Sequence, residues 1–236
     1  MKTTRPEVIE SDRAAAGSRP CGPYQRWGKR LLDVVLAVSG LSIALPLIAL
    51  GAVAIKLASR GPIFFRQWRV GQYGKPFQII KLRTMTDQAE RHGPRLTASG
   101  DSRITAVGRW LRGTKIDELP QLFNILRGEM SFVGPRPEVP EYVATYGPRQ
   151  GNVLNARPGV TGPASLAFID EEKVLAGQPN QEDFYLRALM PMKLDLDLAY
   201  CNKVTLWADL KLIVVTLARI FCGSKNSPMT SSVRSG

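Results

Sequence analysis

The chain has 236 residues, a formal net charge of +12 and a sequence pI near 10. This length suits one sizeable domain plus an appendage, and the charge restricts the partners to anions such as nucleic acid, anionic lipids or phosphorylated small molecules. Three widely spaced cysteines and a single histidine, His92, argue against a disulfide framework, a zinc site or catalysis by a histidine-paired nucleophile. The chemistry is therefore expected to use carboxylates, Arg and Lys.

Two segments at the chain ends have the composition of disordered tails. Residues 1–26 and 223–236 are rich in charged and small residues and lack apolar periodicity, and the first of these tails is basic. Between them, the 22 residues from Val34 to Ile55 contain no charged side chain. As a helix this run can cross the hydrocarbon core, which is about 30 Å thick. We therefore predict a membrane helix within residues 27–60; a signal peptide and a buried core helix are the alternatives.

The flanks of this run bear on its topology. Basic residues stand on both sides of it: Arg26, Lys29 and Arg30 before it, and Lys56 and Arg60 after it. Because basic residues prefer the cytoplasmic side, both ends are expected there. Pro46 lies near the middle, where it removes a backbone donor and kinks a helix. The prediction is a re-entrant helix that enters and leaves through one leaflet, with an ordinary spanning helix that tolerates Pro46 as the open alternative.

The remaining chain is predicted to be α+β and mostly helical. Two β-prone runs, residues 62–68 and 77–83, are separated by turn residues and predict a hairpin. Helical apolar spacing predicts helices over residues 104–112, 117–127, 138–146, 182–190 and 204–221, with Gly113 and Gly128 as stops. The last helix suits either packing on a core or lying in the membrane interface. We expect residues 61–222 to form one cytoplasmic catalytic domain.

Two adjacent carboxylates, Asp117 and Glu118, stand at the start of a predicted helix, where Pro120 is tolerated in the first turn. A helix start has unpaired amides and a positive dipole end, which suit phosphate. Carboxylates can approach phosphate productively there when a divalent cation lies between them, which suggests magnesium with oxygen ligands. The simpler interpretation is that Asp117 caps the helix and Glu118 favours its dipole.

Basic residues gather in the sequence around this point, and most such residues are ordinarily solvated surface. Arg136 differs because prolines on both sides restrain its backbone, which pre-orients the guanidinium for bidentate phosphate contact. Arg157 lies in a second restrained loop, Arg157-Pro158-Gly159-Val160-Thr161-Gly162. Alone, each loop is only a turn with a charge.

Taken together, residues 26 to 221 resemble the bacterial sugar transferase family, the monotopic polyprenyl-phosphate phosphoglycosyl transferases. Six motifs in this order carry the resemblance: Lys29-Arg30-Leu31-Leu32-Asp33, Lys81-Leu82-Arg83-Thr84-Met85, Asp117-Glu118-Leu119-Pro120-Gln121-Leu122, Met130-Ser131-Phe132-Val133-Gly134-Pro135-Arg136-Pro137, Arg157-Pro158-Gly159-Val160-Thr161-Gly162 and Asp209-Leu210-Lys211. Any one of them is weak evidence, and the ordered set is highly specific.

The resemblance implies a reaction in which a UDP-sugar and undecaprenyl phosphate give undecaprenyl-diphosphosugar and UMP with Mg²⁺. It implies that Asp117 is the nucleophile of a covalent phosphosugar intermediate and that Glu118 positions metal or handles protons, so both are candidate metal ligands. It also implies that Arg112, Arg136 and Arg157 neutralise substrate phosphates. The expected location is the bacterial inner membrane, with the catalytic domain on the cytoplasmic face. The product would start glycoconjugate or exopolysaccharide assembly.

One departure from the family concerns the membrane helix. Many members place a small polar residue before the kinking proline, whereas this chain has Leu45 before Pro46. The chain also lacks the several-helix membrane domain that larger members carry, so we expect a minimal, catalytic-domain-only form. The motifs do not identify the sugar, the pathway or the oligomeric state, because specificity rests on a few pocket contacts.

A membrane-tethered protein that binds nucleic acid or anionic lipid without catalysis is the competing interpretation. Against it, the sequence shows no aromatic stacking platform among the basic residues and no recognised nucleic-acid motif, so we expect no nucleic-acid partner. A purely structural anchor would leave the Asp-Glu and Pro-Arg-Pro motifs unexplained.

Overall fold

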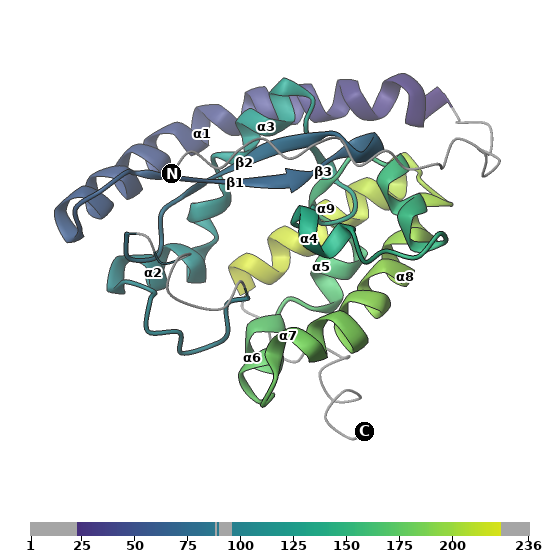
Figure 1. The fold of residues 1–236 in the computed structure, drawn as a ribbon. Helices are drawn as coiled ribbons and strands as arrows, with labels where there is room; N and C mark the ends of the chain where they lie inside the picture. The colour runs from purple at the N-terminus through teal and green to yellow at the C-terminus, as the bar shows by residue number, and fades with distance from the viewer. Residues whose placement is uncertain (1–22, 88, 90–95, 223–236) are drawn as a thin grey trace.

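The computed structural model describes residues 23–87, 89 and 96–222. The predicted tails therefore lie outside the described residues except for 23–26, as does His92. Helical structure begins within that short stretch: Tyr24–Gly28 form one π-helical turn, η1, which continues into α1 (Lys29–Ala58). Helix α1 runs along the top of the molecule in Figure 1, above the strands and the other helices.

Helix α1 has two apolar sides with different surroundings. Its buried residues recur every three, four or seven positions, which places them on one face: Asp33, Ala37, Ala44, Ile48, Gly51 and Ile55. Large apolar side chains elsewhere on the helix are exposed: Leu31, Val35, Val38, Ile43, Leu45, Leu47, Leu50, Val53 and Leu57. The helix from Tyr24 to Ala58 is long and apolar enough to cross a membrane. Only 22% of its most apolar 18-residue stretch is buried against the rest of the protein. Pro46 lies inside it, with helical structure on both sides.

The predicted hairpin is confirmed. Strands β1 (Phe64–Val70) and β2 (Pro76–Leu82) pair antiparallel across a short 3-10 turn, η2 (Gln72–Gly74), with Trp68 opposite Gln78. Helix α2 (Ala106–Thr114), the 3-10 turn η4 (Ile116–Glu118) and helix α3 (Gln121–Arg127) follow. In Figure 1 the hairpin and α2 lie beneath α1, while α3 overlaps α1 in this view and packs against it.

The second half of the chain is mainly helical around one small parallel sheet. Strand β3 (Ser131–Val133) pairs in parallel with β4 (Gly159–Thr161). Both strands are short, and they are widely separated in the sequence. The other elements are α4 (Pro140–Val143), η5 (Gln150–Asn155), α5 (Pro163–Ala167), α6 (Glu171–Ala176), α7 (Gln181–Phe184), η6 (Tyr185–Leu189), α8 (Met190–Cys201) and α9 (Leu206–Cys222). The expected class is thus confirmed as mostly helical α+β with a long apolar N-terminal helix and small sheets.

Two hydrophobic clusters hold these elements together. One joins the second half of the chain, with Tyr142, Tyr185, Leu189 and Leu194 among its buried members. The other includes the buried face of α1 together with the hairpin, α2 and α3: Ala37, Ala44, Ile48, Ile55, Phe77, Ile79, Leu82, Leu111, Leu122, Ile125 and Met130. Helix α1 is therefore part of a core shared with the rest of the domain.

Polar contacts fix the N-terminal end of α1 to the same folded unit. The Lys29 ammonium lies 2.5 Å from a carboxylate oxygen of Asp209 in α9. Arg30 donates to the carbonyls of Ile125 (2.6 Å) and Leu126 (2.9 Å) at the C-terminal end of α3. These two contacts dock the start of α1 on elements that follow it by about a hundred residues or more.

The C-terminal end of α1 is held in a similar way. The buried side chain of Arg83, just after β2, donates to the carbonyls of Ser59 (3.2 Å) and Arg60 (2.9 Å) and to the Ser59 hydroxyl (2.7 Å). Both ends of α1 are thus bonded to one domain.

Candidate active site

A sharp turn between two helical segments positions the paired carboxylates. Helix α2 ends at Thr114, and Lys115 follows in a left-handed conformation with φ of 59°. This conformation costs a non-glycine residue roughly 1–2 kcal/mol, and it turns the chain into η4. The predicted helix over residues 117–127 therefore begins as a 3-10 turn, with α3 starting only at Gln121. The expected stop at Gly128 is confirmed, whereas α2 continues past Gly113.

Asp117 is buried within this turn. Its side chain belongs to a residue only 6% exposed, and Oδ1 has no hydrogen-bond partner among the described residues. Burial, followed by the negative charge of Glu118, raises the pKa of Asp117 to about 6. No side-chain cap bond is formed at the start of η4 or α3, so the structure gives the capping interpretation no support. A buried carboxylate with a free oxygen is available for chemistry.

Glu118 is held by two cations. Lys81 of β2 donates to its Oε1 at 2.7 Å, and Arg136 donates to the same oxygen at 3.3 Å. Burial alone would raise the pKa of Glu118, but the positive charges of Lys81 and Arg136 outweigh burial and hold that pKa well below its usual range. The two adjacent carboxyl groups therefore titrate far apart, a pattern typical of functional sites.

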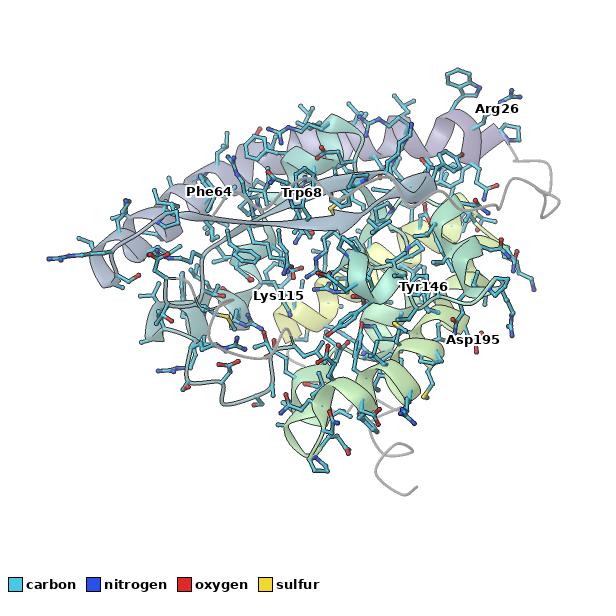
Figure 2. The ribbon with its side chains drawn as sticks, viewed as in Figure 1. Arg26, Phe64, Trp68, Lys115, Tyr146 and Asp195 are labelled. Atoms are coloured by element: carbon cyan, nitrogen blue, oxygen red, sulfur yellow. The ribbon has the colours of Figure 1, made fainter. Side chains whose placement is uncertain are left out.

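The small parallel sheet fixes the loop that carries Arg136. Gly134 donates to the carbonyl of Thr161 (2.9 Å), and Gly159 donates to the carbonyl of Pro135 (2.8 Å). A Cβ atom on Gly159 would lie 2.1 Å from the Gly134 nitrogen, so the two backbones approach closely enough to require glycine. The loops that carry Arg136 and Arg157 are therefore joined directly by these backbone hydrogen bonds. Figure 2 shows Lys115, next to the carboxylates, beneath the hairpin strand that carries Trp68.

Comparison with known proteins identifies this arrangement. Residues 24–223 match the family model described as "Bacterial sugar transferase". The chain belongs to the bacterial sugar transferase family. This membership accounts for the ordered motifs that the sequence presents.

Several relatives of this transferase carry more specific names. It is 42% identical over 216 residues to a UDP-glucose:undecaprenyl-phosphate glucose-1-phosphate transferase of Caulobacter vibrioides, covering 84% of this chain and 73% of that protein. It is 38% identical to an undecaprenyl-phosphate glucose phosphotransferase of Komagataeibacter xylinus, covering 85% of this chain and 37% of that protein. It is 35% identical to a UDP-N-acetylgalactosamine-undecaprenyl-phosphate N-acetylgalactosaminephosphotransferase of Aeromonas hydrophila, covering 88% and 47%. The chain thus spans less than half the length of the last two.

Arg112 and Arg157 occupy different surroundings in the transferase. Arg112 pairs with Glu172 and lies 3.5 Å from the Thr84 hydroxyl, and its charge acts on Asp117. Arg157 instead interacts electrostatically with Arg30 and Asp33 near the N-terminal end of α1, and burial lowers its pKa. Arg136 and Arg112 therefore belong to the surroundings of the two carboxylates, whereas Arg157 lies near the N-terminal end of α1.

Two further residues of this site, Lys81 and Gln121, have no sequence pattern that singles them out individually. Lys81 is the partner of Glu118, and its signal was a lysine inside an apolar strand of a family motif. Gln121 is almost completely buried four residues after Asp117, within the motif that was recognised. In both cases the motif was noted but the individual side chain was not.

Proposed function

We propose that this chain transfers a sugar 1-phosphate from a UDP-sugar to undecaprenyl phosphate and releases UMP, the first membrane step of glycoconjugate or exopolysaccharide assembly. The observation that carries the proposal is the buried Asp117 Oδ1, which has no hydrogen-bond partner among the described residues, next to Glu118, which binds Lys81 and Arg136. Family membership and the names of the relatives support the same reaction.

The first half-reaction forms an aspartyl-phosphosugar. An Asp117 carboxylate oxygen attacks the phosphorus that bears the sugar, the bond from this phosphorus to the bridging oxygen breaks, and UMP leaves with the electron pair. Arg136 and Lys81 lie where they can stabilise charge on the phosphoryl oxygens, and Arg112 adds positive charge to the surroundings of Asp117.

The second half-reaction returns the enzyme to its starting state. A phosphate oxygen of undecaprenyl phosphate attacks the same phosphorus, and the bond to Asp117 breaks to restore the free carboxylate. Arg157 interacts electrostatically with Arg30 and Asp33 near the start of α1, which supports a role for it in neutralising the phosphate of the lipid substrate.

The residues of the site could supply only part of a magnesium coordination sphere. Mg²⁺ is usually held by one or two carboxylates together with waters and substrate phosphates. Asp117 Oδ1 lacks a protein partner, and the described residues contain no cluster of three or more acidic, His or Cys side chains. Asp117 and Glu118 would therefore hold an ion that is completed by the donor diphosphate. When bound, the ion would neutralise phosphate charge as a Lewis acid.

The attachment of α1 supports a monotopic placement at the inner membrane. Lys29 and Arg30 bond its first turn to the domain, Arg83 bonds its last residues to the same domain, and an apolar face between them remains exposed. A helix with both ends bonded to one cytoplasmic domain cannot present them on opposite sides of the membrane. We therefore infer that helix α1 enters and leaves through one leaflet, with the catalytic domain on the cytoplasmic face.

The decisive experiment separates the two half-reactions. The enzyme is incubated with Mg²⁺ and UDP-glucose or UDP-N-acetylgalactosamine in the absence of lipid. We expect UMP release of about one equivalent and a phosphosugar adduct, detected by intact-mass spectrometry and mapped to Asp117. Asp117→Asn, which keeps the shape and removes the nucleophile, should form no adduct while remaining folded. An adduct on another residue, or an active Asp117→Asn enzyme, would end the assignment.

A further inference from the structure

Gln121, the first residue of α3, has a buried amide without a protein partner. The residue is 2% exposed, and Nε2 has no hydrogen-bond partner among the described residues. Buried side-chain amides nearly always form hydrogen bonds, because leaving one unsatisfied costs stability. An exception of this kind calls for a physical reason.

The neighbouring amide shows that this region can satisfy a buried amide. Asn124, one turn further along α3, donates 2.7 Å bonds to the Gln78 carbonyl and to Glu129, and it accepts a 3.1 Å bond from the Ile80 nitrogen. It is fully buried and ties α3 to β2. Asn124 is structural, whereas Gln121 makes no such bond and faces a different environment.

That environment is a small cavity of about 20 Å³ that opens to the surface. A cavity of this volume holds about one water molecule, so a single oxygen atom of a phosphoryl group fits in it. Its described lining consists of Arg69, Ile79, Lys81, Gln121, Arg136, Pro137 and Gly159. Three of these side chains are cations, although Lys81 and Arg136 also bind Glu118 and Arg69 lies 3.7 Å from Glu138. An anion that enters the cavity would share these cations with the two carboxylates.

We propose that the Gln121 amide binds the diphosphate of the nucleotide-sugar donor, between Lys81 and Arg136, while Asp117 attacks. This inference rests on the proposed function and adds a substrate-binding residue to it. A neutral donor has a physical advantage here. An amide N–H binds phosphoryl oxygens without adding positive charge to a site that already holds Lys81 and Arg136.

The test measures donor binding and stability in the same proteins. Binding of UDP and of UDP-glucose, with Mg²⁺, is measured by calorimetry in an Asp117→Asn background, so that no turnover occurs. We expect Gln121→Met, which keeps length and removes the amide, to weaken both ligands by about 10-fold or more. Its Tm should stay the same or rise, because an unsatisfied buried amide is removed. Asn124→Leu, the matched control, should lower Tm because it removes three bonds.

Each result has one consequence. Unchanged binding of UDP in Gln121→Met would overturn the inference, and so would weakening confined to UDP-glucose, since the amide would then contact the sugar. A fall in Tm like that of Asn124→Leu would make Gln121 a structural residue. If the wild-type enzyme neither binds UDP-sugars nor releases UMP from them, the proposed function itself fails, which is a separate outcome.

Discussion

At the scale of single residues, the site depends on two adjacent carboxyl groups in unlike surroundings. Asp117 is buried with one free oxygen, whereas Glu118 shares its oxygen with Lys81 and Arg136. The sequence could predict the pair and the importance of Arg136, because both lie in restrained, recognisable motifs. It could not predict the roles of Lys81 and Gln121, because those roles depend on the packing of β2 against η4 and α3.

The titration of Asp117 predicts a pH dependence of the first half-reaction. Only the carboxylate attacks, and the pKa of Asp117 is raised to about 6. Single-turnover UMP release should therefore be constant above about pH 7 and fall about tenfold per pH unit below about pH 6. Because a raised carboxyl pKa means that the folded state binds this proton more tightly, protonation of Asp117 stabilises the fold as the pH falls from 6 toward 3.8.

Protonation of Asp117 therefore does not unfold the protein, so the expected loss of rate reflects the loss of the nucleophile. Circular dichroism at each pH checks that the protein remains folded. A rate that stays constant down to pH 4.5 would show that Asp117 titrates like an ordinary aspartate and would contradict the prediction.

Replacing Arg136 tests whether a planar guanidinium at this position is needed to bind a substrate phosphate. Its guanidinium is 39% exposed, so it can reach a substrate while it holds Glu118. Loss of a charge-assisted hydrogen bond costs about 1.5–3 kcal/mol, so Arg136→Ala should lower kcat/KM about 10- to 150-fold. Lysine should restore little activity, because it lacks the planar fork. Steady-state kinetics with a normally folded variant provide the measurement, and wild-type values would remove the claim.

At the scale of elements, the sequence predicted the helices and strands that depend on residues close together in the chain. The hairpin, α2 and α9 follow from alternation and helical spacing in contiguous segments. The parallel pair β3 and β4 could not be predicted, because each strand has three residues and the pairing joins Ser131 to Gly159. The predicted helix over residues 182–190 corresponds to α7 and η6 and ends at the first residue of α8, so α8 itself was not predicted. Its buried charged residues Lys193 and Asp197 interrupt the apolar pattern.

The close approach of β3 and β4 predicts a stability effect. In Gly159→Ala, the new methyl group would meet the Gly134 backbone, so one strand must shift at a cost of about 1–3 kcal/mol. Thermal unfolding should show a lower Tm and, because the Arg136 loop moves, lower activity. The control is Gly113→Ala in α2, where no atom lies within 4 Å of the new methyl group. That change should be neutral or stabilising by up to about 1 kcal/mol. Equal Tm values for the two variants would contradict this account.

At the scale of the whole molecule, the position of α1 predicts where its two ends are found. In a chain whose native cysteines are replaced by serine, thiols are introduced at the exposed positions Pro23 and Pro62. Both should react in inside-out vesicles with a reagent that does not cross membranes, and neither should react in intact spheroplasts. Labelling of the residue 23 thiol only in spheroplasts, with residue 62 still labelled only in inside-out vesicles, would show a spanning helix.

The contact between Lys29 and Asp209 has a consequence for the order of synthesis. These two residues are 180 positions apart, and they join the first helix of the chain to the last. At about 5–20 residues per second, the ribosome completes this interval in about 10–35 seconds. During that time Lys29 has no partner, and the face of α1 that will enter the core has nothing to cover it. We therefore propose that the newly made helix rests in the bilayer while its own domain is translated, so that the membrane serves as its first folding partner.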